Sequence, residues 1–135
     1  MTRLNQTFES IHNIRPYALG QGITARAIEA DRMTIAVVDL DPGAVLPEHH
    51  HENEQLGFVI AGSLTMRIGS EGRELHVGDM YAIPSDVPHD AVAGPEGCVV
   101  ADVFAPPRAD WNDLKRLDPA PAAGLRPRAG PWAPA

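Results

Sequence analysis

The sequence has little cysteine and no long apolar run. Cys98 is the one cysteine among 135 residues, so an intramolecular disulfide is excluded. That usage is typical of a reducing compartment such as the cytoplasm. No apolar stretch is long enough to cross a bilayer, and the first ten residues lack the apolar core of a signal peptide. We therefore expect a cytoplasmic protein with no membrane partner.

Positive charge is also scarce. Lysine and arginine together number 11 against 18 acidic residues, giving a net charge of −7. Proteins that bind nucleic acid neutralise phosphates with clustered basic side chains, and the one such cluster here lies near the C-terminus. No helix pair typical of a DNA-binding module is evident either. A nucleic-acid partner is therefore not expected.

Turn-forming residues are abundant. The chain holds 12 glycines and 13 prolines, while 44% of its residues are hydrophobic, which is a globular composition. Short β-branched runs between these turn signals predict an all-β sandwich or barrel. We expect strands at residues 23–30, 33–40, 56–60, 63–68, 73–77, 80–83, 89–93 and 98–104, and a strand that carries the histidines between the second and third of these. Turns that separate neighbouring strands are expected at the glycine-containing segments Ala61-Gly62 and Gly94-Pro-Glu-Gly97.

The two ends of the chain differ from this central region. Residues 1–22 are expected to form an N-terminal arm, ahead of a barrel at residues 23–107. A short helix is predicted at 108–117, capped by Asp110, with Trp111, Leu114 and Leu117 on one apolar side. Residues 118–135 are a Pro/Ala-rich tail, in which Trp132 is the expected anchor.

Histidines dominate the polar residues of the central region. His49 and His51 are two apart, so a strand would present both on one face and His50 on the other. In an unbroken strand Gln55 would share the face of His49 and His51. His89 follows a second turn-rich segment. Three imidazoles and a carbonyl oxygen suit one divalent metal, such as zinc, nickel, manganese or iron. The alternative is a metal-free barrel whose histidines are satisfied by hydrogen bonds.

These spacings resemble the two motifs of the cupin family. The first is matched by Gly43, His49, His51 and Gly62, with Gln55 where most members have glutamate. The second is matched by Gly78, Pro84 and His89, with Asp86 replacing a glycine and Ala93 an asparagine. The resemblance covers residues 23–107. It implies a single double-stranded β-helix (jelly-roll) barrel, a homodimer, and metal ligands at His49, His51, Gln55 and His89.

A further stretch resembles the cupins of pectin and alginate breakdown, which convert unsaturated uronate monosaccharides to linear keto sugars. It runs Asp102-Val-Phe-Ala-Pro-Pro-Arg108-Ala-Asp-Trp, together with the segment that follows Glu54-Gln55. The similarity implies that Asp102, Phe104 and Arg108 surround the substrate. Asp102 would transfer a proton and Arg108 would hold a substrate carboxylate. Equally, Asp102 and Arg108 could form structural salt bridges, and Phe104 could belong to the core.

The neutral glutamine ligand bears on the chemistry. Three imidazoles and an amide leave the full charge of a metal dication in place, which favours polarisation of a substrate over oxygen activation. We therefore predict a metal-dependent isomerase or lyase-like enzyme acting on a small oxygenated substrate, with Tyr81 and Met66 also lining the pocket. The alternatives are a dioxygenase, a polyketide cyclase or hydroxynitrile lyase, and a non-catalytic barrel that binds a sugar or metal.

Overall fold

The structure, a computed structural model, describes residues 7–119. Its elements are β1 (Tyr17–Gly20), β2 (Ile23–Glu29), β3 (Thr34–Leu40), β4 (Val45–His49), β5 (Glu54–Ile68), β6 (Glu71–His76), β7 (Met80–Ile83), β8 (His89–Ala105) and the 3-10 helices η1 (Ile11–Asn13) and η2 (Ala109–Asp113). Within this part of the chain, no helix has the length and apolar character needed to cross a bilayer. The all-β prediction is confirmed.

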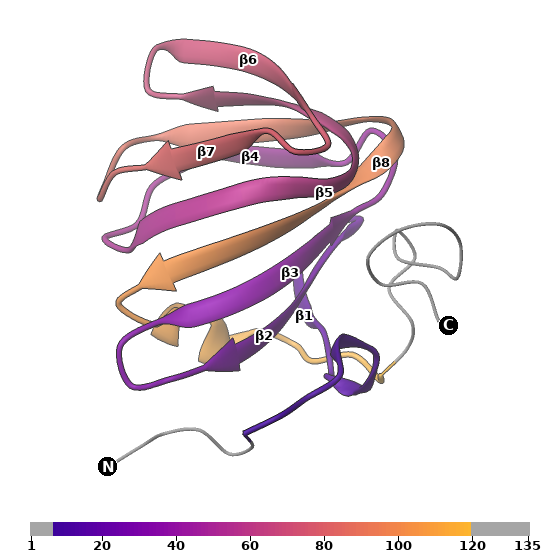
Figure 1. The fold of residues 1–135 in the computed structure, drawn as a ribbon, viewed down its shortest axis with the longest axis vertical. Coiled ribbons are helices and arrows are strands. Elements are labelled where there is room, and N and C mark those ends of the chain that lie inside the picture. Colours follow the sequence, from indigo (N-terminus) through magenta and orange to yellow (C-terminus); the bar gives the residue numbers. More distant parts are fainter. Residues whose placement is uncertain (1–6, 120–135) are drawn as a thin grey trace.

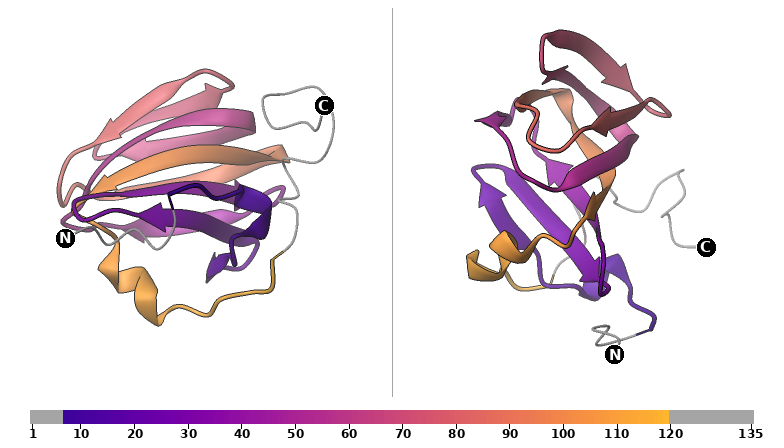
Figure 2. Two further views of the ribbon diagram at one scale, coloured as in Figure 1. Left: turned by 60° about the horizontal axis from the view of Figure 1, so that its bottom comes forward. Right: turned by 90° about the vertical axis from the view of Figure 1, so that its left-hand side faces the viewer.

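Two long strands, β5 and β8, each belong to both layers of the fold (Figures 1 and 2). The first part of β5 pairs with β7 and with the last part of β8, which pairs in turn with β3. The second part of β5 pairs with β6 and with the first part of β8, which also pairs with β4. All these pairs are antiparallel, and β1 and β2 extend the first layer beyond β3. The result is the predicted jelly roll.

The glycines expected to end strands instead mark where the long strands bend. β5 continues through 61–62 and β8 through 94–97, so the predicted hairpin turns at these two places are wrong. The β5–β8 register shifts on both sides of the bend, as at a β-bulge. Gly62 and Gly97 have φ of +71° and +79°, and a Cβ on Gly62 would overlap the Gly97 carbonyl. These glycines let the crossing strands bend at close range without leaving the sheet.

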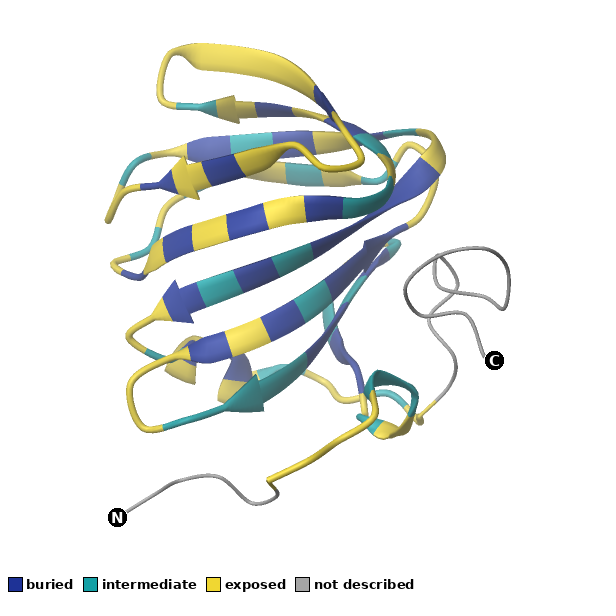
Figure 3. Ribbon diagram, viewed as in Figure 1, coloured by how far each residue is buried: buried dark blue, intermediate teal, exposed yellow. Residues whose placement is uncertain are grey.

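The core lies between the two layers. Buried and exposed positions alternate along β3, β5 and β8, as the bands in Figure 3 show. This alternation places one row of side chains inside the barrel and the other outside. The fully buried members of the inner row include Ile23, Ala25, Ala36, Val59, Leu64 and Ile83.

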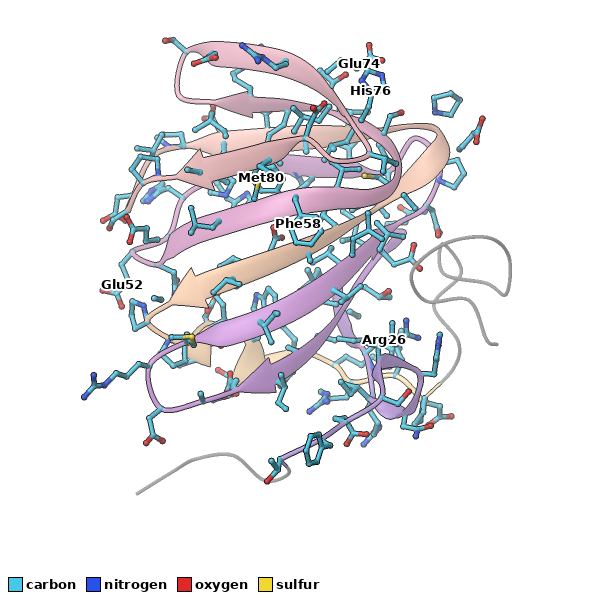
Figure 4. The ribbon with its side chains drawn as sticks, viewed as in Figure 1. Arg26, Glu52, Phe58, Glu74, His76 and Met80 are labelled. Atoms are coloured by element: carbon cyan, nitrogen blue, oxygen red, sulfur yellow. The ribbon has the colours of Figure 1, made fainter. Side chains whose placement is uncertain are left out.

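The outer face of the first layer remains apolar. Phe58 on β5 and Met80 on β7 are register partners and lie side by side in Figure 4, with exposed fractions of 42% and 76%. Ile35 and Leu56 are about as exposed as Phe58 on the same layer. At one end of the layer Ile11 of η1 packs against Val99, but no described residue covers Phe58 and Met80 in this way.

The C-terminal helix is shorter than predicted. η2 is a 3-10 helix that ends at Asp113, and Arg108 rather than Asp110 occupies its N-cap without a side-chain cap. Trp111 is buried as expected. The chain then pairs with β1, because Ala18 N–H donates to Lys115 O and Leu117 N–H donates to Pro16 O. These hydrogen bonds use backbone groups of residues 115–117 that a longer helix would need. β1, which also pairs with β2, lies within the expected N-terminal arm. Trp132 lies outside the described residues.

Candidate metal centre

The three histidines come together from separate elements. β4 ends at His49, His51 lies in the following loop, and His89 begins β8 as the register partner of His49. One ligand atom from each of them lies within 4.8 Å of the others. The strand does not run unbroken from His49 to Gln55, since Gln55 lies on β5 beyond the loop. His49 and His51 therefore come together through the loop after β4 and not through alternation along one strand.

Backbone carbonyls orient all three imidazole rings. The Nδ1 atoms donate to the carbonyls of Pro47, Asn53 and Val87, at 2.9 Å from His49, 3.0 Å from His51 and 2.9 Å from His89. A proton on Nδ1 leaves the Nε2 lone pair free, which is the usual arrangement of a metal-binding histidine. His51 Nε2 is buried and has no hydrogen-bond partner among the described residues. The donor set therefore fits a divalent metal.

Burial favours the neutral form of His51 and His89 by lowering their pKa values. It lowers the pKa of His89 to about 4, and the positive charges of His49, His51 and Arg108 act in the same direction, against a hydrogen bond to Val87 O. Burial is also the main cause of the lowered pKa of His51. The positive charge of Arg108 lowers this pKa further, whereas a hydrogen bond with the Gln55 side chain raises it. Only a neutral imidazole can bind a metal cation, so these two side chains can act as ligands at neutral pH.

Asp102 is a buried carboxylate held from two sides. Its side chain is 4% exposed. Tyr81 Oη donates to its Oδ1 at 2.5 Å, and the Gln55 side chain is a second hydrogen-bond partner. Burial raises the pKa of Asp102 to about 6, against these two hydrogen bonds and the positive charge of Arg108. Burial also raises the pKa of Tyr81, and the nearby Asp102 carboxylate adds to that effect. Asp102 can therefore exchange a proton near neutral pH.

Arg108 is fixed by aromatic rings and a carboxylate. Its guanidinium carbon lies 4.7 Å from the ring centroids of both Phe104 and Trp111. Its Nε donates to Asp110 Oδ1 at 3.0 Å and its Nη2 to Asp110 Oδ2 at 2.9 Å. This bond is the main cause of the lowered pKa of Asp110. One edge of the guanidinium is therefore already occupied, and a substrate could be bound only by the remaining N–H groups.

One cavity of about 370 Å³ joins these groups inside the barrel. It is lined by every residue assigned to the site from the sequence except His51, namely Met66, Tyr81, His49, Gln55, His89, Asp102, Phe104 and Arg108. His51 lies behind this lining, with its ring centroid 4.9 Å from that of His89 and 5.8 Å from that of Phe104. The lining also includes the apolar residues Val38, Leu64 and Val100.

Comparison with known proteins agrees with this arrangement. The cupin domain family matches residues 36–104, from β3 to near the end of β8. The chain belongs to the cupin family. Over 95 residues this cupin is 36% identical to the pectin degradation protein KdgF of Dickeya dadantii, covering 69% of this chain and 86% of that protein.

Solved structures share the fold. The structure of KdgF from Halomonas sp. has a TM-score of 0.72 at 30% identity, covering 78% of this chain and 98% of that one. An RmlC-like cupin from Shewanella frigidimarina has a TM-score of 0.74 at 23% identity, covering 81% and 98%. The second likeness concerns the fold alone. The cupin fold predicted from the histidine and glycine spacings is confirmed.

Several polar or aromatic residues at this cupin's site were not assigned to it from the sequence; Asp110, Trp111 and Asn53 are those that hold other site residues in place. Asp110 was expected to cap a helix and Trp111 to pack on the barrel, but both hold Arg108. Asn53 is buried, and its Nδ2 donates to the carbonyls of Pro106 and Pro107, which ties the His51 loop to the segment before Arg108. The sequence holds no local signal for these contacts, because each joins residues through the folded chain or through a non-helical turn.

Proposed function

We propose that this cupin is a metal-dependent enzyme that transfers a proton on a small oxygenated substrate, with an unsaturated uronate as the leading substrate. One observation carries the proposal: the buried Asp102 carboxylate lines the same cavity as His49 and His89, two of the three converging histidines. The likeness to KdgF, whose name assigns it to pectin degradation, supports a uronate in particular.

The metal would be held by four neutral ligands. His49, His51 and His89 offer Nε2 lone pairs. Because the Gln55 amide donates to Asp102, its carbonyl oxygen is left for a fourth position. When bound, a divalent cation in this set would polarise substrate oxygens and stabilise negative charge next to a carbonyl. Nickel, zinc, manganese and iron all accept these ligands, so the proposal is one divalent transition metal per chain.

The remaining residues divide binding from proton transfer. Asp102 as carboxylate takes a proton from substrate carbon or oxygen, and as carboxylic acid it returns one. The free N–H groups of Arg108 bind the substrate carboxylate. Phe104, Tyr81 and Met66 line the cavity around the substrate and limit its size. Burial of these groups excludes water and strengthens the interaction between the charges.

The test is turnover of an unsaturated uronate without oxygen. Protein loaded in turn with nickel, zinc, manganese and iron would be assayed for conversion to a linear keto sugar by NMR. Asp102→Asn should reduce kcat by about 100-fold or more while metal content is unchanged. Asp86→Asn, at an exposed carboxylate outside the cavity, is the matched control and should retain turnover.

Each alternative gives a different result in the same assay. Oxygen uptake by the iron-loaded protein, together with no turnover when oxygen is absent, would favour a dioxygenase. Turnover confined to an apolar ketide or hydroxynitrile would favour the cyclase or lyase alternatives. Uronate binding with no turnover by any metal form would indicate a non-catalytic barrel. Full turnover by Asp102→Asn would exclude the proton-transfer role.

A further inference from the structure

The bond between Tyr81 and Asp102 passes over a glycine. Gly57 on β5 is the register partner of Tyr81 on one side and of Asp102 on the other. Neighbouring strands in a sheet lie about 4.8 Å apart, so strands β7 and β8 are separated by roughly twice that distance. The Tyr81 and Asp102 side chains bridge this gap on the inner face of β5. The space directly above Gly57 is therefore filled by their hydrogen bond.

A side chain at position 57 has no room. A Cβ there would lie 2.5 Å from Tyr81 Cζ and 2.6 Å from Tyr81 Oη, and it would overlap Asp102 Oδ1. Contacts this short do not occur, so the phenol or the carboxylate would have to move. Both are buried, and Asp102 is also tied to Gln55. Movement that relieved the overlap would break the hydrogen bond.

The backbone at Gly57 gives no other reason for glycine. The residue lies in an ordinary strand and is not among the glycines with positive φ. Gln55 and Val59, its neighbours on the inner face, both carry buried side chains. Glycine weakens the interior of a strand, so a glycine between two inward-facing side chains of β5 indicates that something nearby excludes a side chain at position 57. The close approach of Tyr81 and Asp102 excludes that side chain.

We propose that Gly57 is a positioning residue, whose missing side chain allows Tyr81 to hold the Asp102 carboxylate in one orientation inside the cavity. Without that bond Asp102 keeps its place in the sequence but not its orientation. The proposal extends the function proposed above, since it matters to turnover only if Asp102 transfers the proton. The geometric claim can be tested without any substrate.

The substrate-free test uses the two tyrosines of the chain. Protein containing tyrosine labelled with 13C at Cζ gives two NMR signals, and Tyr81→Phe assigns one of them. That signal reports on the hydrogen bond made by the phenol oxygen. Gly57→Ala should shift it, while Gly72→Ala should leave it in place. Gly72 is the matched control, because it lies on β6 and a Cβ there would have no contact closer than 3.9 Å.

Metal content and turnover complete the experiment. The Gly57→Ala protein should bind as much metal as the wild type, because residue 57 is not one of the proposed metal ligands. If uronate is a substrate, kcat should fall about tenfold or more while KM changes by less than about threefold. An unchanged 13C signal in Gly57→Ala would overturn the proposal. A shifted signal with no uronate turnover in the wild type would support the positioning while rejecting the proposed function.

A double-mutant cycle covers the case in which Gly57→Ala folds poorly. Tyr81→Leu removes the ring from above position 57 and frees Asp102 to turn away. The effect of Gly57→Ala on melting temperature should then be much smaller in the Tyr81→Leu background than in the wild type. An equal effect in both backgrounds would show that Gly57 acts independently of Tyr81, and would overturn the proposal.

Discussion

Tyr81 Oη lies 2.5 Å from Asp102 Oδ1, and this hydrogen bond connects β7 to β8 across β5. It is one of two bonds that hold a carboxylate in an almost completely buried place. A charge in such a place costs free energy unless it is paired, and a neutral phenol pairs it only in part. Burial therefore raises the pKa of Asp102 to about 6, although the hydrogen bonds to Tyr81 and Gln55 both lower it.

The first prediction concerns the pH dependence of stability. Because the pKa of Asp102 is about 6 in the folded protein against an ordinary value of 3.8, the folded state binds more protons than the unfolded state between these values. The free energy of unfolding contributed by Asp102 therefore falls as pH rises through that window, by about 3 kcal/mol for about two pKa units. Urea unfolding of metal-free wild type and Asp102→Asn from pH 4 to pH 7 measures the difference.

Comparison of these two proteins isolates Asp102. The pKa values of His51 and His89 are lowered, so those groups destabilise the folded state as pH falls below the ordinary histidine value. That contribution has the opposite sign, but it is present in both proteins and cancels in the comparison. A wild-type-minus-variant difference that does not vary with pH would contradict the raised pKa.

The second prediction concerns the metal ligands. His51→Ala removes one of three converging imidazoles, so a site that holds about one metal per chain should become nearly empty. His50→Ala is the natural control: His50 is exposed and contacts Asp86 at 3.5 Å outside the cluster. Elemental mass spectrometry of protein reconstituted with each metal gives the ratio. Equal metal content in the two variants would rule out His51 as a ligand.

The third prediction concerns the support of Arg108. Asp110→Asn weakens the hydrogen bonds that fix its guanidinium, and the substrate carboxylate should then bind less tightly. We expect KM for an unsaturated uronate to rise about tenfold and kcat to change by less than about threefold. Asp113→Asn, three residues further along the same 3-10 helix, should leave both constants unchanged. A fall in kcat alone would indicate that Arg108 does not bind the ground-state substrate.

The fourth prediction concerns the homodimer, which remains a prediction from the sequence. The exposed apolar surface around Phe58 and Met80 offers a contact face for a second copy of the chain. A charge at the centre of such a face is unfavourable, so Phe58→Glu should yield a monomer in light scattering where the wild type has twice that mass. Val92→Glu, at an exposed residue of the other layer, should not change the mass. A monomeric wild type would refute the dimer.

The sequence alone determined the fold class and the residues that gather in the site. Histidine spacing, turn glycines and alternating hydrophobicity are local patterns, and the cupin motifs combine them at fixed separations. These patterns pointed to His49, His51 and His89, which the folded chain brings within 4.8 Å. The resemblance to the cupins of pectin and alginate breakdown implied Asp102, Phe104 and Arg108, and these residues line one cavity with His49 and His89.

Only the tertiary structure decided how those residues are held. Gly62 and Gly97 read as turns because a glycine signal is the same at a bend as at a strand end, and only cross-strand pairing separates the two. The hydrogen-bond partners of Asp102 come from β7 and β5. Asp110, the partner of Arg108, lies in the short 3-10 helix after β8, beyond which the chain pairs with β1. Such contacts depend on register between strands, which the order of residues along one strand does not specify.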